Sequence, residues 1–308
     1  MNQKHLHVLY HLMAIMVIMI WGVTFVNTKV LLGHGMDAAE IFVLRFVMGY
    51  ALIWMMNDGG QTLPNGRRLR RKLFADSWRD EGILVLISIT GGSLYFMMEN
   101  LAVKYSLTNN VSFIVCTAPL WTIMLGMAVF RDVKATPRLL SGSAAALLGM
   151  ALIIFNGQFV MHLNPLGDML ALAAALNWAV YSLLMRNIAK RYSAVFVTRK
   201  LFFYGLLTIL PYFAFYPWQF PLSRLSEATV MGNLLFLGVL ASFVGYALWS
   251  LSIKKIGAIS ASNYVYLNPI ATVVASAIFL NEPMTLMAYA GLALILLGVY
   301  FANTHTSE

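Results

Sequence analysis

The chain has 308 residues, of which 60% are hydrophobic and 11% are charged. A soluble globular domain carries roughly 25% charged residues, so this composition excludes a water-soluble protein and indicates a polytopic membrane protein. The formal net charge of +9 does not require a nucleic-acid partner, because the Lys and Arg residues fall mainly in short loops between apolar segments.

Ten apolar runs are long enough to be membrane-spanning segments. A helix satisfies its own backbone hydrogen bonds within lipid, and no alternating barrel pattern is present, so the runs predict an all-α integral membrane fold. The first run continues to about Leu32 without a small-residue cleavage site, and we interpret it as a retained span. The predicted spans are 9–31, 38–56, 82–103, 108–130, 138–156, 167–187, 195–217, 229–252, 260–280 and 285–302.

The distribution of basic residues predicts the orientation. If the N-terminus is inside, nearly all Lys and Arg residues lie in cytoplasmic loops, including the basic run from Arg67 to Lys72. The outer side then holds only Lys29, Lys104 and Arg224. Cytoplasmic loops are enriched in Lys and Arg, so we expect a multi-pass protein of the cell inner membrane with both termini in the cytoplasm.

The two halves of the sequence align with each other. A shift of 150 residues superimposes Pro119 on Pro269, and smaller changes of shift pair Arg45 with Arg199 and Trp21 with Trp178. Each half would then be a unit of five helices. Because five is odd, the second unit enters the membrane from the opposite side, which predicts two inverted five-helix repeats with a binding site between them.

Three stretches resemble the EamA family of the drug/metabolite transporter superfamily. They are "WGVTFVNTKVLL" in the first span, "AAEIFVLRF" opening the second, and "LNPIATVVASAIFLNEPMTLMAYAGLALILLGVYF" near the C-terminus. The resemblance implies two tandem EamA-like units, at about residues 12–156 and 167–302. It also implies transport of a small metabolite, with export of amino acids or other metabolites known among related proteins.

Two prolines lie near the middle of the fourth and ninth spans. Pro119 and Pro269 each remove a helical hydrogen bond and are expected to kink their helices. One interpretation is simple helix curvature, and the other is a gating or cavity-shaping role. The occurrence of both prolines in corresponding spans favours gating.

Glu99 is a carboxylate inside the third predicted span. It lies roughly 26 Å along that helix from the cytoplasmic side, at a depth similar to that of Arg45, which is about 10 Å below the outer face. An Arg45–Glu99 ion pair is therefore possible, with Lys29 and Lys104 as alternative partners. Arg45 and its repeat partner Arg199 fit structural anchors. In the repeat alignment Glu99 falls on Trp249, so the second half has no corresponding acidic residue. Glu99 could bind a substrate amine, couple protons to transport, or form a structural ion pair.

Aromatic, amide and hydroxyl residues recur at corresponding depths in several spans. A small-molecule pocket is mostly apolar with a few polar groups, so these residues predict a substrate site rather than an interfacial belt. Together with Glu99, the candidate substrate-binding residues are Trp21, Thr24, Asn27, Tyr95, Asn177, Trp178, Tyr181, Tyr246, Trp249, Asn263, Tyr264 and Tyr266.

The leading hypothesis is a secondary transporter that exports a small metabolite, such as an amino acid, by alternating access in the lipid bilayer, with protons as a possible coupling ion. A membrane scaffold or lipid-handling protein is the alternative. An intramembrane enzyme is less favoured, because no nucleophile or metal-ligand motif is present and the single cysteine, Cys116, lies in an apolar run. We expect no cofactor and no metal site.

Overall fold

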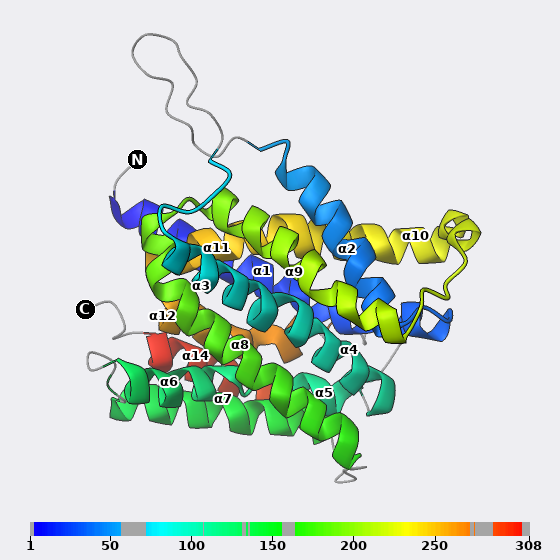
Figure 1. Ribbon diagram of the computed structural model, residues 1–308. Helices are drawn as coiled ribbons and strands as arrows, with labels where there is room; N and C mark the ends of the chain where they lie inside the picture. The colour runs from blue at the N-terminus through cyan, green and yellow to red at the C-terminus, as the bar shows by residue number, and fades with distance from the viewer. Residues whose placement is uncertain are drawn as a thin grey trace.

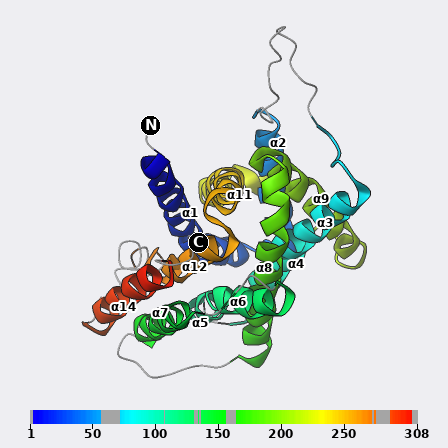
Figure 2. The same ribbon diagram turned by 90° about the vertical axis from the view of Figure 1, so that its left-hand side faces the viewer.

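The computed structural model describes residues 3–56, 72–106, 108–130, 134, 136–155, 164–271, 274 and 286–303. Within these ranges the chain forms helices joined by turns and short loops, with no strand. The helices pack into one bundle, shown from two sides in Figures 1 and 2. Residues 67–71 of the basic loop and most of 272–285, which include the end of the predicted span 260–280, lie outside the described part.

The described residues of the first half form eight helical elements. In chain order they are α1 (Gln3–Gly33), α2 (Ala38–Ile53), α3 (Trp78–Ser88), the π-helical η1 (Ile89–Ser93), α4 (Leu94–Tyr105), α5 (Thr108–Val115), α6 (Ala118–Val129) and α7 (Pro137–Phe155).

The second half repeats much of this order. Its elements are α8 (Pro165–Arg191), α9 (Ala194–Phe215), the 3₁₀-helical η2 (Leu222–Ser226), α10 (Ala228–Leu235), the π-helical η3 (Phe236–Val244), α11 (Gly245–Ile256), α12 (Ala258–Asn263), the 3₁₀-helical η4 (Tyr264–Leu267) and α14 (Leu286–Asn303).

Six helices in the described ranges are long and apolar enough to cross a membrane. They are His7–Gly33, Trp78–Tyr105, Val111–Val129, Pro165–Arg191, Ala194–Phe215 and Ala228–Ile256. Shorter apolar helices at Pro137–Leu152 and Tyr289–Asn303 occupy two further predicted spans, and α2 occupies another. The prediction of an all-helical membrane protein is therefore confirmed.

Local sequence signals explain where the helices begin and end. Gly35 has a φ of +88°, which suits a residue without a side chain in the turn between α1 and α2. Asp37 then caps α2 by accepting a hydrogen bond from the backbone N–H of Ala39, while the Asp37 N–H donates to the Glu40 carboxylate. The side chains of Ser77, Asn164 and Ser193 each accept one backbone hydrogen bond at the start of α3, α8 and α9.

Two long spans contain π-helical segments at matching places. The segment η1 separates α3 from α4, and Gly92 within it has a non-helical backbone with φ −128° and ψ −106°. The segment η3 separates α10 from α11. A shift of 150 residues places Gly91 of η1 on Ala241 of η3. Such segments release backbone carbonyls from the regular ladder and often mark functional positions.

In the described residues, the predicted spans four and nine are interrupted rather than smoothly kinked. In span four, α5 ends at Val115 and α6 begins at Ala118, so the interruption lies just before Pro119. In span nine, α12 gives way to the 3₁₀ turn η4 just before Pro269. Pro119 lies in the first turn of α6, and Pro269 lies in the first turn of the helical residues that follow η4. A proline has no backbone N–H and fits this position, because the first turn of a helix has no acceptor for that N–H.

Glycines bring α7 and α14 into close contact. A Cβ atom on Gly149 would lie 2.6 Å from the carbonyl oxygen of Gly291, and one on Gly142 would lie 2.6 Å from that of Gly298. Figures 1 and 2 show these two helices side by side at one edge of the bundle. Small residues at such an interface allow two backbones to approach, which is a common way to pack helices in membranes.

This contact generates the first prediction. Gly149→Ala should lower the apparent melting temperature of the detergent-solubilised protein by several degrees, because the new methyl group meets backbone atoms and overpacking costs about 1–3 kcal/mol. Gly82→Ala is the matched control, since a Cβ atom there meets nothing within 4 Å. Equal melting temperatures for the two variants would contradict the close packing of α7 on α14.

Candidate functional site

A cavity lies inside the bundle, between the two halves of the chain. Its walls come from α1, α2, α4 and α5 of the first half and from α8, α11, η4 and Asn268 of the second. The cavity volume open to the centre of a water-sized sphere is about 30 Å³, so the cavity is narrow in this conformation. The lining residues are Ile18, Trp21, Thr24, Phe25, Arg45, Tyr95, Phe96, Glu99, Val115, Trp178, Tyr246, Val265 and Asn268.

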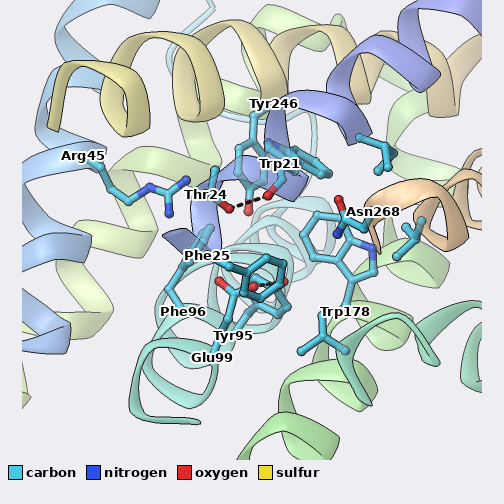
Figure 3. A pocket seen from close by; sticks show the side chains of 13 residues that line it. Trp21, Thr24, Phe25, Arg45, Tyr95, Phe96, Glu99, Trp178, Tyr246 and Asn268 are labelled. Atoms are coloured by element: carbon cyan, nitrogen blue, oxygen red, sulfur yellow. Dashed lines mark hydrogen bonds between the residues drawn. The ribbon is translucent and has the colours of Figure 1, made fainter. Parts of the chain in front are cut away.

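Six of the thirteen lining residues are aromatic. The Trp21 and Trp178 rings meet edge to face with centroids 5.2 Å apart, and Tyr95 lies 5.0 Å from Trp178. Tyr246 is 5.5 Å from Trp21 on the other side. Figure 3 shows these rings converging from different helices around one space. An aromatic box with a few polar groups is the usual form of a small-molecule site.

The π-helical segments hold two of these rings in place. The Tyr246 hydroxyl donates a hydrogen bond to the carbonyl of Gly91 in η1, at 2.6 Å. The Trp21 indole Nε1 donates to the carbonyl of Ala241 in η3, at 2.9 Å. Both acceptors are thus in π-helical segments, at positions that the 150-residue shift superimposes. These bonds satisfy buried polar atoms and orient the rings.

Arg45 on α2 is a buried cation in the cavity wall, with 2% of its surface exposed. Its Nε donates to the hydroxyl of Ser242 at 2.9 Å, and its guanidinium carbon lies 4.2 Å from the centre of the Phe96 ring. The hydroxyl and the ring face both favour the positive charge at this depth. Sequence reasoning treated Arg45 as a structural anchor and did not place it in the cavity.

Glu99 on α4 is a buried anion in the same wall, with 6% of its surface exposed. It accepts a hydrogen bond from the Tyr95 hydroxyl, one helical turn earlier, at 2.7 Å. The possible Arg45–Glu99 ion pair is not formed, because the two charged groups do not approach within 4.0 Å. Figure 3 shows Arg45 and Glu99 at different places on the cavity wall.

The two lysines considered as alternative partners of Glu99 also interact elsewhere. The Lys29 ammonium donates to the carbonyl of Val103 at 3.0 Å. The Lys104 ammonium lies 3.8 Å from Asp37 at the end of α2. Neither lysine lines the cavity, so Tyr95 is the residue whose side chain contacts the Glu99 carboxylate directly.

The structure brings six of the predicted substrate-binding residues together in the wall. They are Trp21, Thr24, Tyr95, Glu99, Trp178 and Tyr246. Two more support the wall from behind: Tyr181 packs against Trp178 at 4.8 Å, and Trp249 lies 5.2 Å from Trp21.

The other five predicted residues do not line the cavity. Asn27 donates to Asn233 at 2.7 Å, and Asn177 donates to the carbonyl of Ala173 on its own helix at 2.8 Å. Asn263 donates to Asn303, and the Tyr264 hydroxyl bonds His11. Tyr266 is fully buried in the core. Their depth along the spans was compatible with a site, but their direction around the helix axis was not.

Several wall residues were not predicted. Phe25 and Phe96 lie one helical turn or less from predicted residues, and Asn268 directly precedes Pro269. Pro119 and Pro269 do not line the cavity, although Val115 and Asn268 beside the two breaks do. Arg199 lies away from the wall, with its guanidinium 4.8 Å from the centre of the Trp54 ring.

The chemical groups of the cavity wall are those of a small-molecule binding site. The wall contains no serine, cysteine or histidine, and the described ranges contain no group of three or more His, Cys, Asp or Glu side chains that could hold a metal ion. Its chemistry consists of one cation, one anion, ring faces and a few hydrogen-bonding groups.

Comparisons with known proteins agree with this arrangement. The model of the EamA-like transporter family matches the chain twice, at residues 8–155 and 165–304. A "probable amino-acid metabolite efflux pump" of Escherichia coli K12 is 24% identical over 94% of this chain and 92% of its own length. A "probable terminal-alkyne amino-acid exporter" of Streptantibioticus cattleyicolor is 25% identical over 74% of this chain and 75% of its own.

The fold is also found among solved structures. One crystal structure superimposes with a TM-score of 0.71 and 18% sequence identity, covering 95% of this chain and 96% of its own. At that identity the likeness shows the fold alone. The family model, in contrast, covers nearly the whole sequence in two copies. The chain is therefore a multi-pass membrane protein that belongs to the EamA-like transporter family.

Proposed function

We propose that the chain is a secondary transporter that exports a small metabolite, such as an amino acid, across the inner membrane by alternating access. The observation that carries this proposal is the central cavity, which is lined by both halves of the chain. A site shared by two halves becomes accessible from either side when the halves rock against each other. The names of two relatives, an amino-acid metabolite efflux pump and an amino-acid exporter, support export.

Ten spans in two inverted repeats, over residues 12–156 and 167–302, fit the packing. Two contacts between the halves each have a counterpart in which the corresponding helices of the two halves are swapped. The contact of α4 with α8 corresponds to that of α11 with α1, and the contact of α2 with η3 corresponds to that of α9 with η1. The helices α7 and α14, which are last in their halves, pack on each other. The matching π-helical segments η1 and η3 support the same assignment.

Polar clusters at the two ends of the bundle suit the two gates of such a mechanism. At the predicted cytoplasmic end, Lys200 of α9 contacts Glu81 of α3, and Arg191 of α8 contacts Asp80 of α3 at 2.6 Å. At the predicted outer end, Tyr212 of α9 donates to Asp37 at 3.0 Å. Each cluster joins the two halves, so each would separate in one of the two open states. The breaks beside Pro119 and Pro269 would allow the required bending.

Glu99 is the candidate for proton coupling. Ionisable groups inside membrane spans commonly bind ions or protons in transporters. Tyr95 donates to one carboxylate oxygen, and the carboxylate faces the cavity rather than a basic partner. A group that exchanges a proton for a substrate needs such access to the transport path.

A scaffold or lipid-handling role is less favoured. Such a role would be favoured if Trp178, Tyr246 and Asn263 faced lipid, but these residues are 5%, 1% and 0% exposed. Trp178 and Tyr246 instead line the cavity, and Asn263 is bonded within the protein.

Counterflow in proteoliposomes tests the proposed function. Vesicles preloaded with one metabolite from a panel of amino acids and related compounds should accumulate the same labelled metabolite from outside, because a carrier exchanges its substrate across the membrane. Empty vesicles and vesicles with heat-denatured protein are the controls. Failure to exchange any metabolite, at any pH gradient, would contradict transport by this chain.

Glu99→Gln tests the coupling role. The variant keeps the size of the side chain but removes its proton-binding charge, so transport should slow at least tenfold and lose its dependence on the pH gradient. Tyr95→Phe is the matched control, since it removes the hydrogen bond and keeps the carboxylate, and the pH dependence should remain. If Glu99→Gln transports with unchanged pH dependence while its thermal stability falls, Glu99 has a structural role.

A further inference from the structure

The cavity wall holds two opposite charges that leave part of their bonding capacity unused. Arg45 donates from Nε to Ser242, and Glu99 accepts through Oε1 from Tyr95. Among the described residues, no hydrogen-bond partner is found for the two Nη atoms of Arg45 or for Oε2 of Glu99. Both side chains are more than nine-tenths buried and line the same cavity.

Two other buried acidic residues, in contrast, contact a basic side chain directly. Buried Lys200 contacts Glu81 directly, and the largely buried Asp80 contacts Arg191. Buried charges without a partner are strongly unfavourable, so a cation and an anion that face one cavity without contact call for a third participant. Figure 3 shows the guanidinium directed toward the space between the rings.

We propose that the cavity selects a zwitterionic α-amino acid with an apolar side chain, and that Arg45 is a substrate-binding residue. The substrate carboxylate would accept hydrogen bonds from the guanidinium of Arg45, whose planar fork matches a carboxylate. The substrate ammonium would donate to Glu99. This inference rests on the proposed transport function and names its substrate class.

The rest of the cavity wall fits the apolar side chain of such an amino acid. Phe25, Phe96 and Trp21 present ring surfaces to the cavity, and Ile18, Val115 and Val265 complete an apolar lining. Trp178 also lines the cavity, and its indole Nε1 is buried without a hydrogen-bond partner in the described structure. An apolar side chain would be enclosed by these groups, while a strongly polar one would lose its hydration without compensation.

Recognition of both charges would also make the cavity reject compounds that resemble the amino acid but carry only one of its two charges. An amine without a carboxylate leaves Arg45 uncompensated, and an acid without an amine leaves Glu99 uncompensated. Leaving one buried charge unpaired is a strong means of discrimination. Arg199, the repeat counterpart of Arg45, makes no such contribution, because it lies outside the cavity.

Matched ligand series test the inference on the unmodified protein. Affinities are measured by isothermal titration calorimetry in detergent for leucine, isopentylamine and 4-methylpentanoate, and for phenylalanine, phenethylamine and 3-phenylpropionate. In at least one series the zwitterion should bind tenfold or more tightly than both single-charge analogues. The inference is overturned if an amine or an acid binds as tightly as its amino acid, or if none of the six binds.

Single variants then assign the two charges. Arg45→Gln should remove the preference for the amino acid over the amine, and Glu99→Gln should remove its preference over the acid. Arg199→Gln, the matched loss of a guanidinium outside the cavity, should keep the original order. Arg45→Lys provides a charged variant if Arg45→Gln does not fold, and it should retain part of the preference over the amine.

The outcome separates this inference from the proposed function. If counterflow reveals exchange of some metabolite but the amino-acid series binds without the expected order, the chain is a transporter and the zwitterion assignment is wrong. If no metabolite is exchanged, the proposed function fails first. Unchanged ligand order in both Arg45→Gln and Glu99→Gln would overturn the role of these residues directly.

Discussion

The rest of the site depends on the burial of two opposite charges at the centre of a membrane-spanning bundle. Arg45 and Glu99 lie in one cavity, yet each is held by a neutral neighbour, Ser242 or Tyr95. A direct ion pair would compensate both charges but would also close the cavity to a polar ligand. Their separation keeps both charges available, at a cost in stability that the Phe96 ring and the neighbouring hydroxyls reduce.

Irregular backbone around the cavity makes this arrangement possible. The π-helical segments η1 and η3 provide the carbonyls that hold Tyr246 and Trp21, and η3 also contains Ser242, the partner of Arg45. Regular α-helices would have used these carbonyls within their own ladders. Non-helical backbone at membrane depth is tolerated only inside protein or against a cavity, and Gly92 of η1, whose backbone is non-helical, is buried. The glycine contact between α7 and α14 packs the last helices of the two halves together at one edge of the bundle.

Sequence reasoning was successful for features that depend on composition and on depth. The low charge content predicts a membrane protein, and the depth of Trp21 and Trp178 along their spans favours an internal position over an interfacial belt. Both residues line the cavity. It was less successful for direction around a helix axis. Asn27 and Asn177 have suitable depths but point toward Asn233 and toward their own helix. The partner of a side chain depends on which helices are neighbours, and this information is spread over distant parts of the chain. Arg45 is a second example. Its alignment with Arg199 in the repeat suggested a structural anchor, but the packing of the helices places Arg45 in the cavity wall.

The central claim is that Arg45 and Glu99 act together on a ligand rather than on each other. A double-mutant cycle with Arg45→Gln, Glu99→Gln and the double variant measures this most directly, by recording both the leucine affinity and the ligand-free melting temperature. If Arg45 and Glu99 both bind the ligand, the two substitutions should be coupled more strongly in their effect on leucine affinity than in their effect on the ligand-free melting temperature. Additive effects on leucine affinity, together with strong coupling in ligand-free stability, would contradict it and would identify a structural ion pair.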